Sequence, residues 1–153
     1  MLILQQVYFP AGTYIVSAPI IDYYYTQLIG NPNCMPVLQA SSGFTGSWDI
    51  DGDEYQAPPA GQSSGVLAYG ATNIFWRQVR NFVIDMTNVS PSVGLYGIHW
   101  PTAQATSLQN IVIKMSEASG TQHKGIFIES GSGGFMADLT FYGGYWGMWL
   151  SNQ

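Results

Sequence analysis

Two short, strand-like motifs recur at nearly constant spacing through the second half of the chain. Gly-Ile-His-Trp at 97–100 is followed 28 residues later by Gly-Ile-Phe-Ile at 125–128, and 22 residues after that by Gly-Met-Trp-Leu at 147–150. A second series runs Asn-Phe-Val-Ile at 81–84, Asn-Ile-Val-Ile at 110–113 and Asp-Leu-Thr-Phe at 138–141. Two interleaved series with one period predict a single structural unit that is repeated along the chain.

The residue types within this period favour strands. Short β-branched and aromatic runs are bounded by Gly, Asn, Pro or Ser, and no stretch longer than about ten residues combines a 3.6-residue apolar period with a cap. A period of roughly 20 to 30 residues built from short strands is typical of a parallel β-helix. We therefore predict an all-β fold, a single-stranded parallel β-helix (solenoid) of about 5–6 coils, formed by residues 1–153 as one domain.

Alternation within the second series predicts which side chains fill the solenoid. Side chains of a strand point alternately to opposite faces, so the first and third apolar residues of each motif should face inward and the middle one outward. The polar residue before each motif can hydrogen-bond the turning backbone, which makes it a structural corner residue. The inward set is Phe82, Ile84, Ile111, Ile113, Leu139 and Phe141, the outward set is Val83, Val112 and Thr140, and the corner set is Asn81, Asn110 and Asp138.

The first half of the chain is less regular. Residues 7–16 read as strand, Pro-Gly turn and strand, and 19–22 and 27–30 extend the pattern. Residues near 41–65 are rich in Ser, Gly, Asp and Pro, which predicts a loop excursion from the coil. Loops of this kind often form a binding face.

The charge content excludes several classes of function. Only 4 residues are Lys or Arg against 9 Asp or Glu, for a net charge of −5, so there is no basic patch for nucleic acid. No run of about 20 apolar residues is present to span a membrane, and the first residues show no signal peptide. The single cysteine, Cys34, is expected to be a small buried residue.

Candidate metal ligands do not form a recognisable pattern, so we expect neither a metal nor a cofactor. The acidic run at 49–54 lacks the Gly at position six and the Glu at position twelve of a calcium-binding loop, which favours a solvated acidic turn. His99 and His123 have no second ligand at metal-binding spacing.

Polar and aromatic residues gather around two successive repeats. Ten Tyr, five Trp and seven Phe among few charges suit a cleft that stacks on sugar rings and hydrogen-bonds their hydroxyl groups. If the coils stack in register, the loops after Trp100 and after Ile128 lie side by side. Glu129 is the carboxylate of interest, with a surface pair to Lys124 as the alternative. The candidate residues are Trp100, Gln104 and Gln109 in the first loop region and Gln122, His123, Glu129, Ser130 and Ser132 around the next.

Five longer runs resemble the N-terminal β-helix of glycoside hydrolase family 55, a group of largely fungal, secreted exo-β-1,3-glucanases in the pectate-lyase-like superfamily. The resemblance extends from about residue 7 to residue 153. The runs are Val-Tyr-Phe-Pro-Ala-Gly-Thr-Tyr at 7–14, Asp-Tyr-Tyr-Tyr-Thr-Gln-Leu-Ile-Gly-Asn-Pro at 22–32, Arg-Gln-Val-Arg-Asn-Phe-Val-Ile-Asp at 77–85, Gly-Ile-His-Trp-Pro-Thr-Ala-Gln-Ala-Thr-Ser-Leu-Gln-Asn at 97–110, and Gly-Ile-Phe-Ile-Glu-Ser-Gly-Ser-Gly-Gly at 125–134.

The resemblance implies a right-handed coil, β-1,3-glucan or laminari-oligosaccharides as the ligand, secretion, and exo-acting hydrolysis with inversion. Family members carry two β-helical domains, and the second supplies the catalytic acid. The resemblance therefore implies that this chain is truncated at both ends relative to the family and inactive alone, and its own catalytic residues stay unassigned. The family's first domain holds the attacking water, for which Gln104 and Ser132, or Ser130, are the matching positions.

Two alternatives remain at this stage. The chain is a non-catalytic glucan-binding module, or it is an inactive truncated fragment. In the second case its apolar last strand, 146–151, is expected to self-associate or to be covered by a partner chain.

Overall fold

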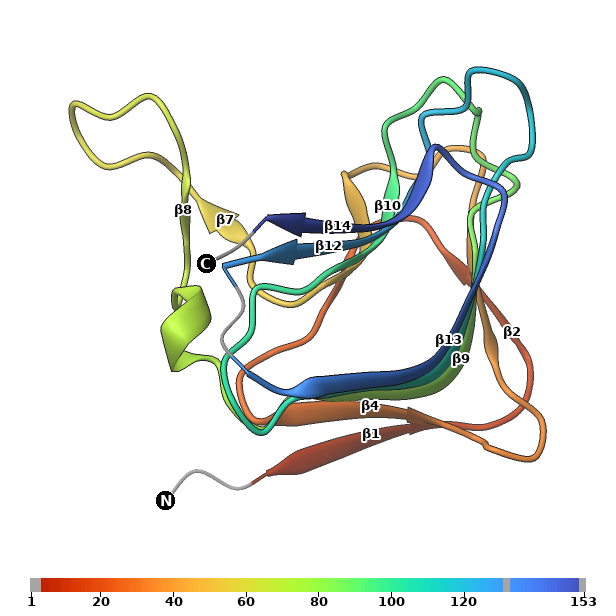
Figure 1. The fold of residues 1–153 in the computed structure, drawn as a ribbon, viewed down its shortest axis with the longest axis horizontal. Coiled ribbons are helices and arrows are strands. Elements are labelled where there is room, and N and C mark those ends of the chain that lie inside the picture. The colour runs from red at the N-terminus through yellow and green to blue at the C-terminus, as the bar shows by residue number, and fades with distance from the viewer. Residues whose placement is uncertain (1–3, 131–132, 152–153) are drawn as a thin grey trace.

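The computed structural model describes residues 4–130 and 133–151, and almost all of its regular structure is strand (Figure 1). The largest sheet, sheet A, has the order β1 (Gln5–Phe9), β4 (Thr26–Gly30), β9 (Gln78–Asp85), β11 (Ser107–Lys114) and β13 (Phe135–Tyr142). In addition, β2 (Thr13–Val16) pairs with β5 (Val37–Ala40), which pairs with the second half of β9.

The opposite wall of the molecule is sheet B. Its order is β3 (Ile20–Ile21), β6 (Trp48–Asp51), β10 (Tyr96–His99), β12 (Lys124–Glu129) and β14 (Trp146–Ser151). All pairings in both sheets are parallel. Each turn of the chain thus contributes one strand to sheet B and one to sheet A, or two to sheet A in the first two coils, and the described residues form five such coils.

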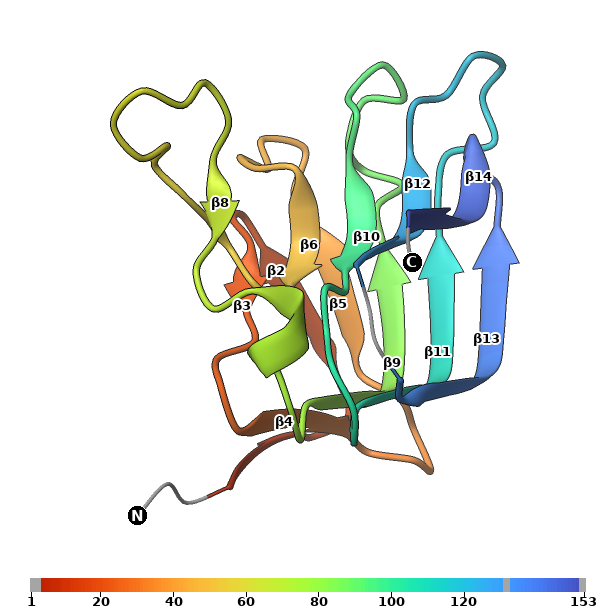
Figure 2. The ribbon, with the colours of Figure 1, turned by 60° about the vertical axis from the view of Figure 1, so that its left-hand side comes forward.

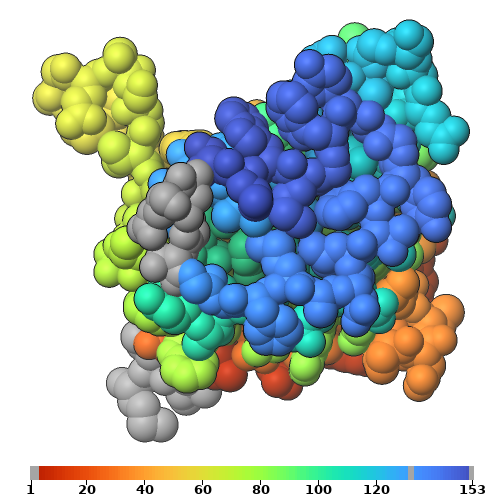
Figure 3. Space-filling view, viewed as in Figure 1, coloured from red at the N-terminus to blue at the C-terminus, as the bar shows by residue number. Residues whose placement is uncertain are grey.

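Viewed down its axis, the chain winds anticlockwise as it advances toward the reader, which makes the coil right-handed (Figure 1). The last coil, including β13 and β14, covers the near end in the space-filling view (Figure 3). The predicted right-handed parallel β-helix is confirmed. Among the described residues no helix reaches the length and apolar character that crossing a membrane requires.

The two sequence repeats are the strands that stack on one another. Ile98 in β10 lies beside Ile126 in β12, and Ile126 lies beside Met148 in β14. In sheet A, Ile111 lies between Phe82 and Leu139. The repeat period is therefore one coil, and equivalent residues lie about 4.8 Å apart.

Inward and outward residues follow the predicted alternation. Phe82, Ile84, Ile111 and Ile113 are fully buried in the core, whereas Val83 and Val112 are half-buried and Thr140 is exposed. Leu139 and Phe141 pack on the same core but are only partly buried, because β13 is the last strand of its sheet.

Asparagine turns the strands of sheet A at one corner. Asn81, Asn110 and Asp138 have φ angles of 64°, 51° and 54°, in the left-handed region that short polar side chains tolerate best. Asn110 donates from Nδ2 to Asn81 Oδ1 at 3.0 Å, and Asn81 donates from Nδ2 to the carbonyl oxygen of Gly30 at 3.1 Å. The predicted structural role of this series is confirmed, and two of its members form a hydrogen-bonded ladder along the coil axis.

The stretch 41–65 divides into two parts. Its middle, β6, belongs to the coil, because Ile50 pairs with Ile20 on one side and Ile98 on the other. Only after Asp53 does the chain leave the coil, in an arm formed by the antiparallel strands β7 (Tyr55–Gln56) and β8 (Val66–Leu67), and it returns through a short 3₁₀-helix, η1 (Ala71–Asn73). The arm extends away from the coil body (Figure 2).

Cys34 was expected to be buried, and this expectation is wrong. The residue is exposed because it lies in the turn between β4 and β5, where the chain rounds a corner of the coil and Asn33 beside it is exposed as well.

Candidate functional site

Four of the candidate residues lie at one corner of the coil, namely Trp100, Gln104, Glu129 and Ser130. Here each coil passes from the end of a sheet B strand to the start of the next sheet A strand, at the left of Figure 1. We call this the site corner and define it by the turns 22–25, 52–77, 100–106 and 130–134, of which 131–132 lie outside the described residues. Because the strands on either side stack in register, these turns stack as well.

Gln104 and Ser130 are both exposed at the site corner. A Cβ atom placed on Gly133 would lie 3.0 Å from Cγ of Gln104, so the turn after Trp100 and the turn after Ile128 are neighbours, as the register argument predicts. Ser132 lies outside the described residues. Trp100 is only 2 % exposed and packs into the core, whereas Gln109 lies within β11 and donates to Ser107 Oγ at 2.8 Å.

Gln122 and His123 lie at the opposite corner, before β12 begins. They are separated from Glu129 by the length of that strand, about 20 Å for six residues. His123 is fully buried, where its Nδ1 accepts from Ser116 N at 3.2 Å and its Nε2 lies 3.1 Å from Ser90 O. Burial lowers the pKa of His123. The structure therefore does not bring these two residues together with Glu129.

Glu129 is held at the site corner by two side chains that the candidate set did not contain. Its Oε2 lies 3.0 Å from Nε2 of His99, and the Tyr55 hydroxyl donates to the same oxygen. The other ring nitrogen of His99, Nδ1, lies 2.8 Å from Oδ1 of Asp51. The Lys124 alternative is wrong, because Lys124 lies at the opposite end of β12, with its Nζ 4.6 Å from the centre of the Tyr96 ring.

Stacked rings fix the orientation of His99. In the register of sheet B, Asp51, His99, Phe127 and Trp149 occupy equivalent positions on successive coils. The imidazole stacks on Trp48 with ring centres 4.3 Å apart, on Tyr55 at 5.5 Å and on Phe127 at 5.6 Å. The ring therefore has little freedom to turn away from its two carboxylate neighbours.

The acidic run at 49–54 is not the solvated turn expected from the sequence. Asp49 and Asp51 are buried because β6 is a coil strand and not part of a loop. Asp53 is buried beneath the returning end of the arm, and only Glu54 is exposed. Asp49 faces the interior, and burial, aided by the nearby Asp85 charge, raises its pKa to about 7. Among the described residues no group of three or more His, Cys, Asp or Glu side chains is arranged to hold a metal ion.

A buried arginine lies inside the site corner. Arg77 is 1 % exposed, and burial lowers its pKa although the charges of Asp22 and Asp53 oppose this effect. Burial raises the pKa of Asp22 to about 8, with Arg77 opposing the shift. Asp53 accepts hydrogen bonds from the backbone of Tyr69 and Gly70, which anchors the returning end of the arm to the coil.

The turns of the site corner share one unusual backbone position. On four successive coils, the residue two places before a paired position of sheet A has a positive φ angle. These residues are Tyr25, Trp76, Ala105 and Gly133, with φ angles of 60°, 64°, 59° and 97°. They therefore form a column along the coil axis, which we call the φ column: its first two members carry aromatic rings, the third a methyl group and the fourth no side chain. Trp76 is 50 % exposed beside the small residues.

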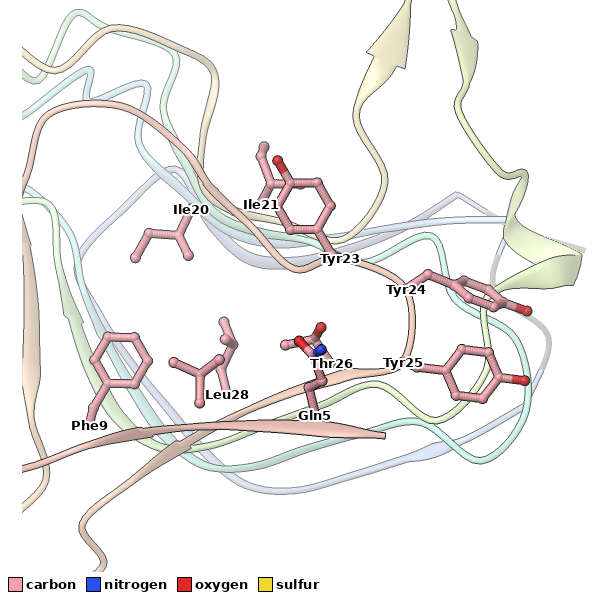
Figure 4. Close-up of a pocket in the computed structure, with 10 residues that line it drawn as sticks. Gln5, Phe9, Ile20, Ile21, Tyr23, Tyr24, Tyr25, Thr26 and Leu28 are labelled. Atoms are coloured by element: carbon pink, nitrogen blue, oxygen red, sulfur yellow. The ribbon is translucent and has the colours of Figure 1, made fainter. Parts of the chain in front are cut away.

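A cavity of about 630 Å³ lies at the first coil (Figure 4). Phe9, Ile20 and Leu28 line its apolar part, whereas the rings of Tyr24 and Tyr25 point away from it toward the site corner. Tyr24 stacks on Tyr69 of the arm with ring centres 5.5 Å apart. This cavity is the open end of the core and is separate from Glu129.

Residues 4–153 match the protein family described as rhamnogalacturonase A/epimerase, pectate lyase-like. The chain belongs to this pectate lyase-like family. Its relatives include a glucan 1,3-beta-glucosidase of Cochliobolus carbonum, 49% identical over 96% of this chain, and a probable glucan endo-1,3-beta-glucosidase of Arthroderma benhamiae, 48% identical over 96% of it. A relative in Penicillium expansum, 47% identical over 96% of the chain, is named non-secreted LysM effector LysM19.

The chain of this pectate lyase-like protein spans only a small part of those relatives. It corresponds to 18% of the length of the Cochliobolus protein, 16% of the Arthroderma protein and 11% of the Penicillium protein. The resemblance to β-1,3-glucanases seen in the sequence is confirmed at the level of this region.

Proposed function

We propose that this chain forms a sugar-binding wall of a β-1,3-glucan hydrolase, with the glucan bound along the site corner. The observation that carries the proposal is the partly exposed carboxylate of Glu129, which is held in place by His99 and the exposed Tyr55. The exposed Trp76 lies in another turn of the same site corner. Relatives named as glucan 1,3-beta-glucosidases supply the substrate class.

The residue types of the site corner match the chemistry of a sugar ligand. Flat aromatic rings pack on the apolar faces of sugar rings, and carboxylate and amide groups hydrogen-bond the hydroxyl groups. The exposed amide of Gln104 lies on the turn beside Ala105, where the small residues of the φ column leave room next to Trp76.

We further propose that the complete reaction is exo-acting and inverting. Inversion requires an acid and a water-activating group about 6.5 to 9.5 Å apart on opposite faces of the scissile bond. In this proposal Gln104, together with Ser130 or Ser132, holds the attacking water, and the acid comes from outside this chain. An extracellular location accompanies the proposal and is tested by assaying the protein in culture medium.

Calorimetric titration with laminaripentaose tests the binding proposal. We expect saturable binding by the chain, with no binding of the β-1,4-linked cellopentaose. Trp76→Ala should weaken binding about tenfold, which corresponds to about 1.4 kcal/mol. The matched control is Tyr142→Ala, which removes an exposed aromatic residue from the end of β13, away from the site corner. Absence of binding at millimolar laminaripentaose contradicts the proposal.

A second candidate is a glucan-binding module without catalysis, favoured by relatives whose printed names are those of LysM effectors. Release of glucose from laminarin by the chain mixed with a domain that supplies the acid favours the hydrolase. Binding without release in that mixture favours the module.

The remaining alternative is an inactive fragment whose last coil self-associates or binds a partner chain. Its contact residues would be the exposed Phe135, Trp149 and Leu150. Light scattering at rising protein concentration tests this alternative.

A further inference from the structure

Building on the proposed function, we propose that Asp51, His99 and Tyr55 are positioning residues that present one oxygen of Glu129 as the acceptor for a glucosyl hydroxyl group. The four side chains come from β6, the arm, β10 and β12, so they meet only in the folded coil. The buried imidazole of His99 connects the buried carboxylate of Asp51 to the partly exposed carboxylate of Glu129.

Two of the three side chains in this connection are buried, and only the outer one is partly exposed. The side chain of Asp51 is 5 % exposed, that of His99 is 0 % exposed and that of Glu129 is 26 % exposed. Oδ1 of Asp51 also accepts from the backbone N–H of Asp53 at 3.1 Å, which fixes the inner carboxylate. The inner end is therefore anchored and the outer end faces the solvent at the site corner.

Only one oxygen of Glu129 is used by these contacts. His99 Nε2 and the Tyr55 hydroxyl both meet Oε2, and neither meets Oε1. Within residues 4–130 and 133–151, Oε1 makes no hydrogen bond, so it is the oxygen assigned to accept from a ligand hydroxyl group.

The two ring nitrogens of His99 hold the imidazole between two carboxylates. Nδ1 lies 2.8 Å from Oδ1 of Asp51 and Nε2 lies 3.0 Å from Oε2 of Glu129. Each oxygen of a carboxyl group has its own acceptor capacity, so Oε1 can accept from a ligand hydroxyl group while Oε2 is held in place.

Tyr55 adds a link between the arm and the acceptor. Its ring covers His99 while its hydroxyl group donates to Glu129, and burial, together with the hydrogen bond to Glu129, raises the pKa of Tyr55. The hydroxyl therefore remains a donor at neutral pH. The ligand class that fits the remaining oxygen and the exposed Tyr55 ring is a β-linked glucosyl residue, which offers hydroxyl donors beside an apolar ring face.

The test combines laminaritriose titration with ¹⁵N-detected NMR of the histidine ring nitrogens. Glu129→Gln and His99→Gln should each weaken laminaritriose binding about tenfold or more, and Tyr55→Phe about threefold. In the NMR spectra, Glu129→Gln and Tyr55→Phe should shift the Nε2 signal of His99, whereas Asp51→Asn should shift its Nδ1 signal. His123→Gln is the matched control, since it replaces the other buried histidine at the opposite corner and should leave both readouts for the site corner unchanged.

The outcomes separate this inference from the proposed function. If the unaltered chain binds laminaritriose and Glu129→Gln binds it equally well, the inference is wrong while the proposed function stands. If the unaltered chain binds no glucan, the proposed function is wrong, and so is the ligand assigned to Glu129. The NMR result then decides whether His99 positions Glu129: an unchanged Nε2 signal of His99 in Glu129→Gln overturns this role, and a shifted signal supports it.

Discussion

The side-chain amide of Asn110 donates to the side-chain oxygen of Asn81, one coil earlier, over 3.0 Å. Both residues have left-handed backbone angles at the corner where the strands of sheet A bend. The ladder thus serves two needs at once: it permits a bend within a hydrogen-bonded strand, and it ties neighbouring coils together at the bend.

Asn110→Ala is expected to lower the free energy of unfolding by about 2 kcal/mol. About half comes from the lost hydrogen bond and about half from placing a Cβ-bearing residue without a local hydrogen bond in the left-handed region. Asn110→Gly is the matched control, because glycine tolerates this backbone angle and loses only the hydrogen bond. Urea denaturation measures both, and an equal loss in the two variants would show that backbone strain plays no part.

Gly125→Ala should prevent normal folding of the last coils. A Cβ atom at this position would overlap the carbonyl oxygen of Gly147 and lie 2.8 Å from the Phe141 ring. Gly43→Ala is the control, since nothing lies within 4 Å of a Cβ atom placed there. Circular dichroism and thermal denaturation compare the two. A melting temperature for Gly125→Ala equal to that of Gly43→Ala would contradict the close approach of the coils.

Neighbouring substitutions in β11 should differ sharply in cost. Ile111 is fully buried and Val112 only half-buried. Ile111→Ala is expected to reduce the free energy of unfolding by about 2 to 5 kcal/mol, whereas Val112→Ala should cost about 1 kcal/mol or less. Denaturant titration measures the difference, and similar losses would contradict the inward and outward assignment.

Buried carboxylates should make the protein less stable as the pH rises. The pKa of Asp49 is about 7 and that of Asp22 about 8 in the folded chain, both above the ordinary value of 3.8. The folded state therefore holds these protons more tightly, so the contribution of these two groups to stability is fully present below about pH 4 and is lost as the pH rises through 7 to 8.

Asp49→Asn removes one of the two carboxyl groups whose titration makes stability depend on pH. The decrease in the free energy of unfolding between pH 5 and pH 8 should be smaller in this variant, by on the order of 2 kcal/mol. At pH 5, where the folded native chain holds the proton, the variant and the native chain should differ less than at pH 8. Parallel pH profiles for the two proteins would contradict a buried, protonated Asp49.

Much of the coil could be predicted because its second half has a nearly constant period. Val112 lies beside both Val83 and Thr140, as the spacing of the repeats requires. The strand at Trp48–Asp51 was missed because the arm lies between it and its partner Tyr96–His99, which lengthens that coil. The composition of the surrounding residues then resembles that of a loop.

The inserted arm is also the reason why the candidate site was not predicted from the sequence. His99 meets Asp51 and Glu129, which lie 48 and 30 residues away in the sequence, so no local pattern connects them. Aligning Trp-Asp-Ile-Asp at 48–51 with Tyr-Gly-Ile-His at 96–99 would have placed Asp51 beside His99. Glu129 could be selected from the sequence because the carboxylate follows a recognised repeat, but Tyr55 could not, since the path of the arm depends on tertiary contacts.

The contact between Tyr55 and Glu129 joins residues 74 positions apart, from the second coil to the fourth. The arm therefore has no partner for its hydroxyl until β12 has paired with β10. A solenoid that grows by adding neighbours completes its first three coils while the hydroxyl group of Tyr55 still lacks its acceptor. The carboxylate proposed to receive the sugar and the side chain that fixes it then come together in one late step, so a chain interrupted before residue 129 would retain much of the coil without the site.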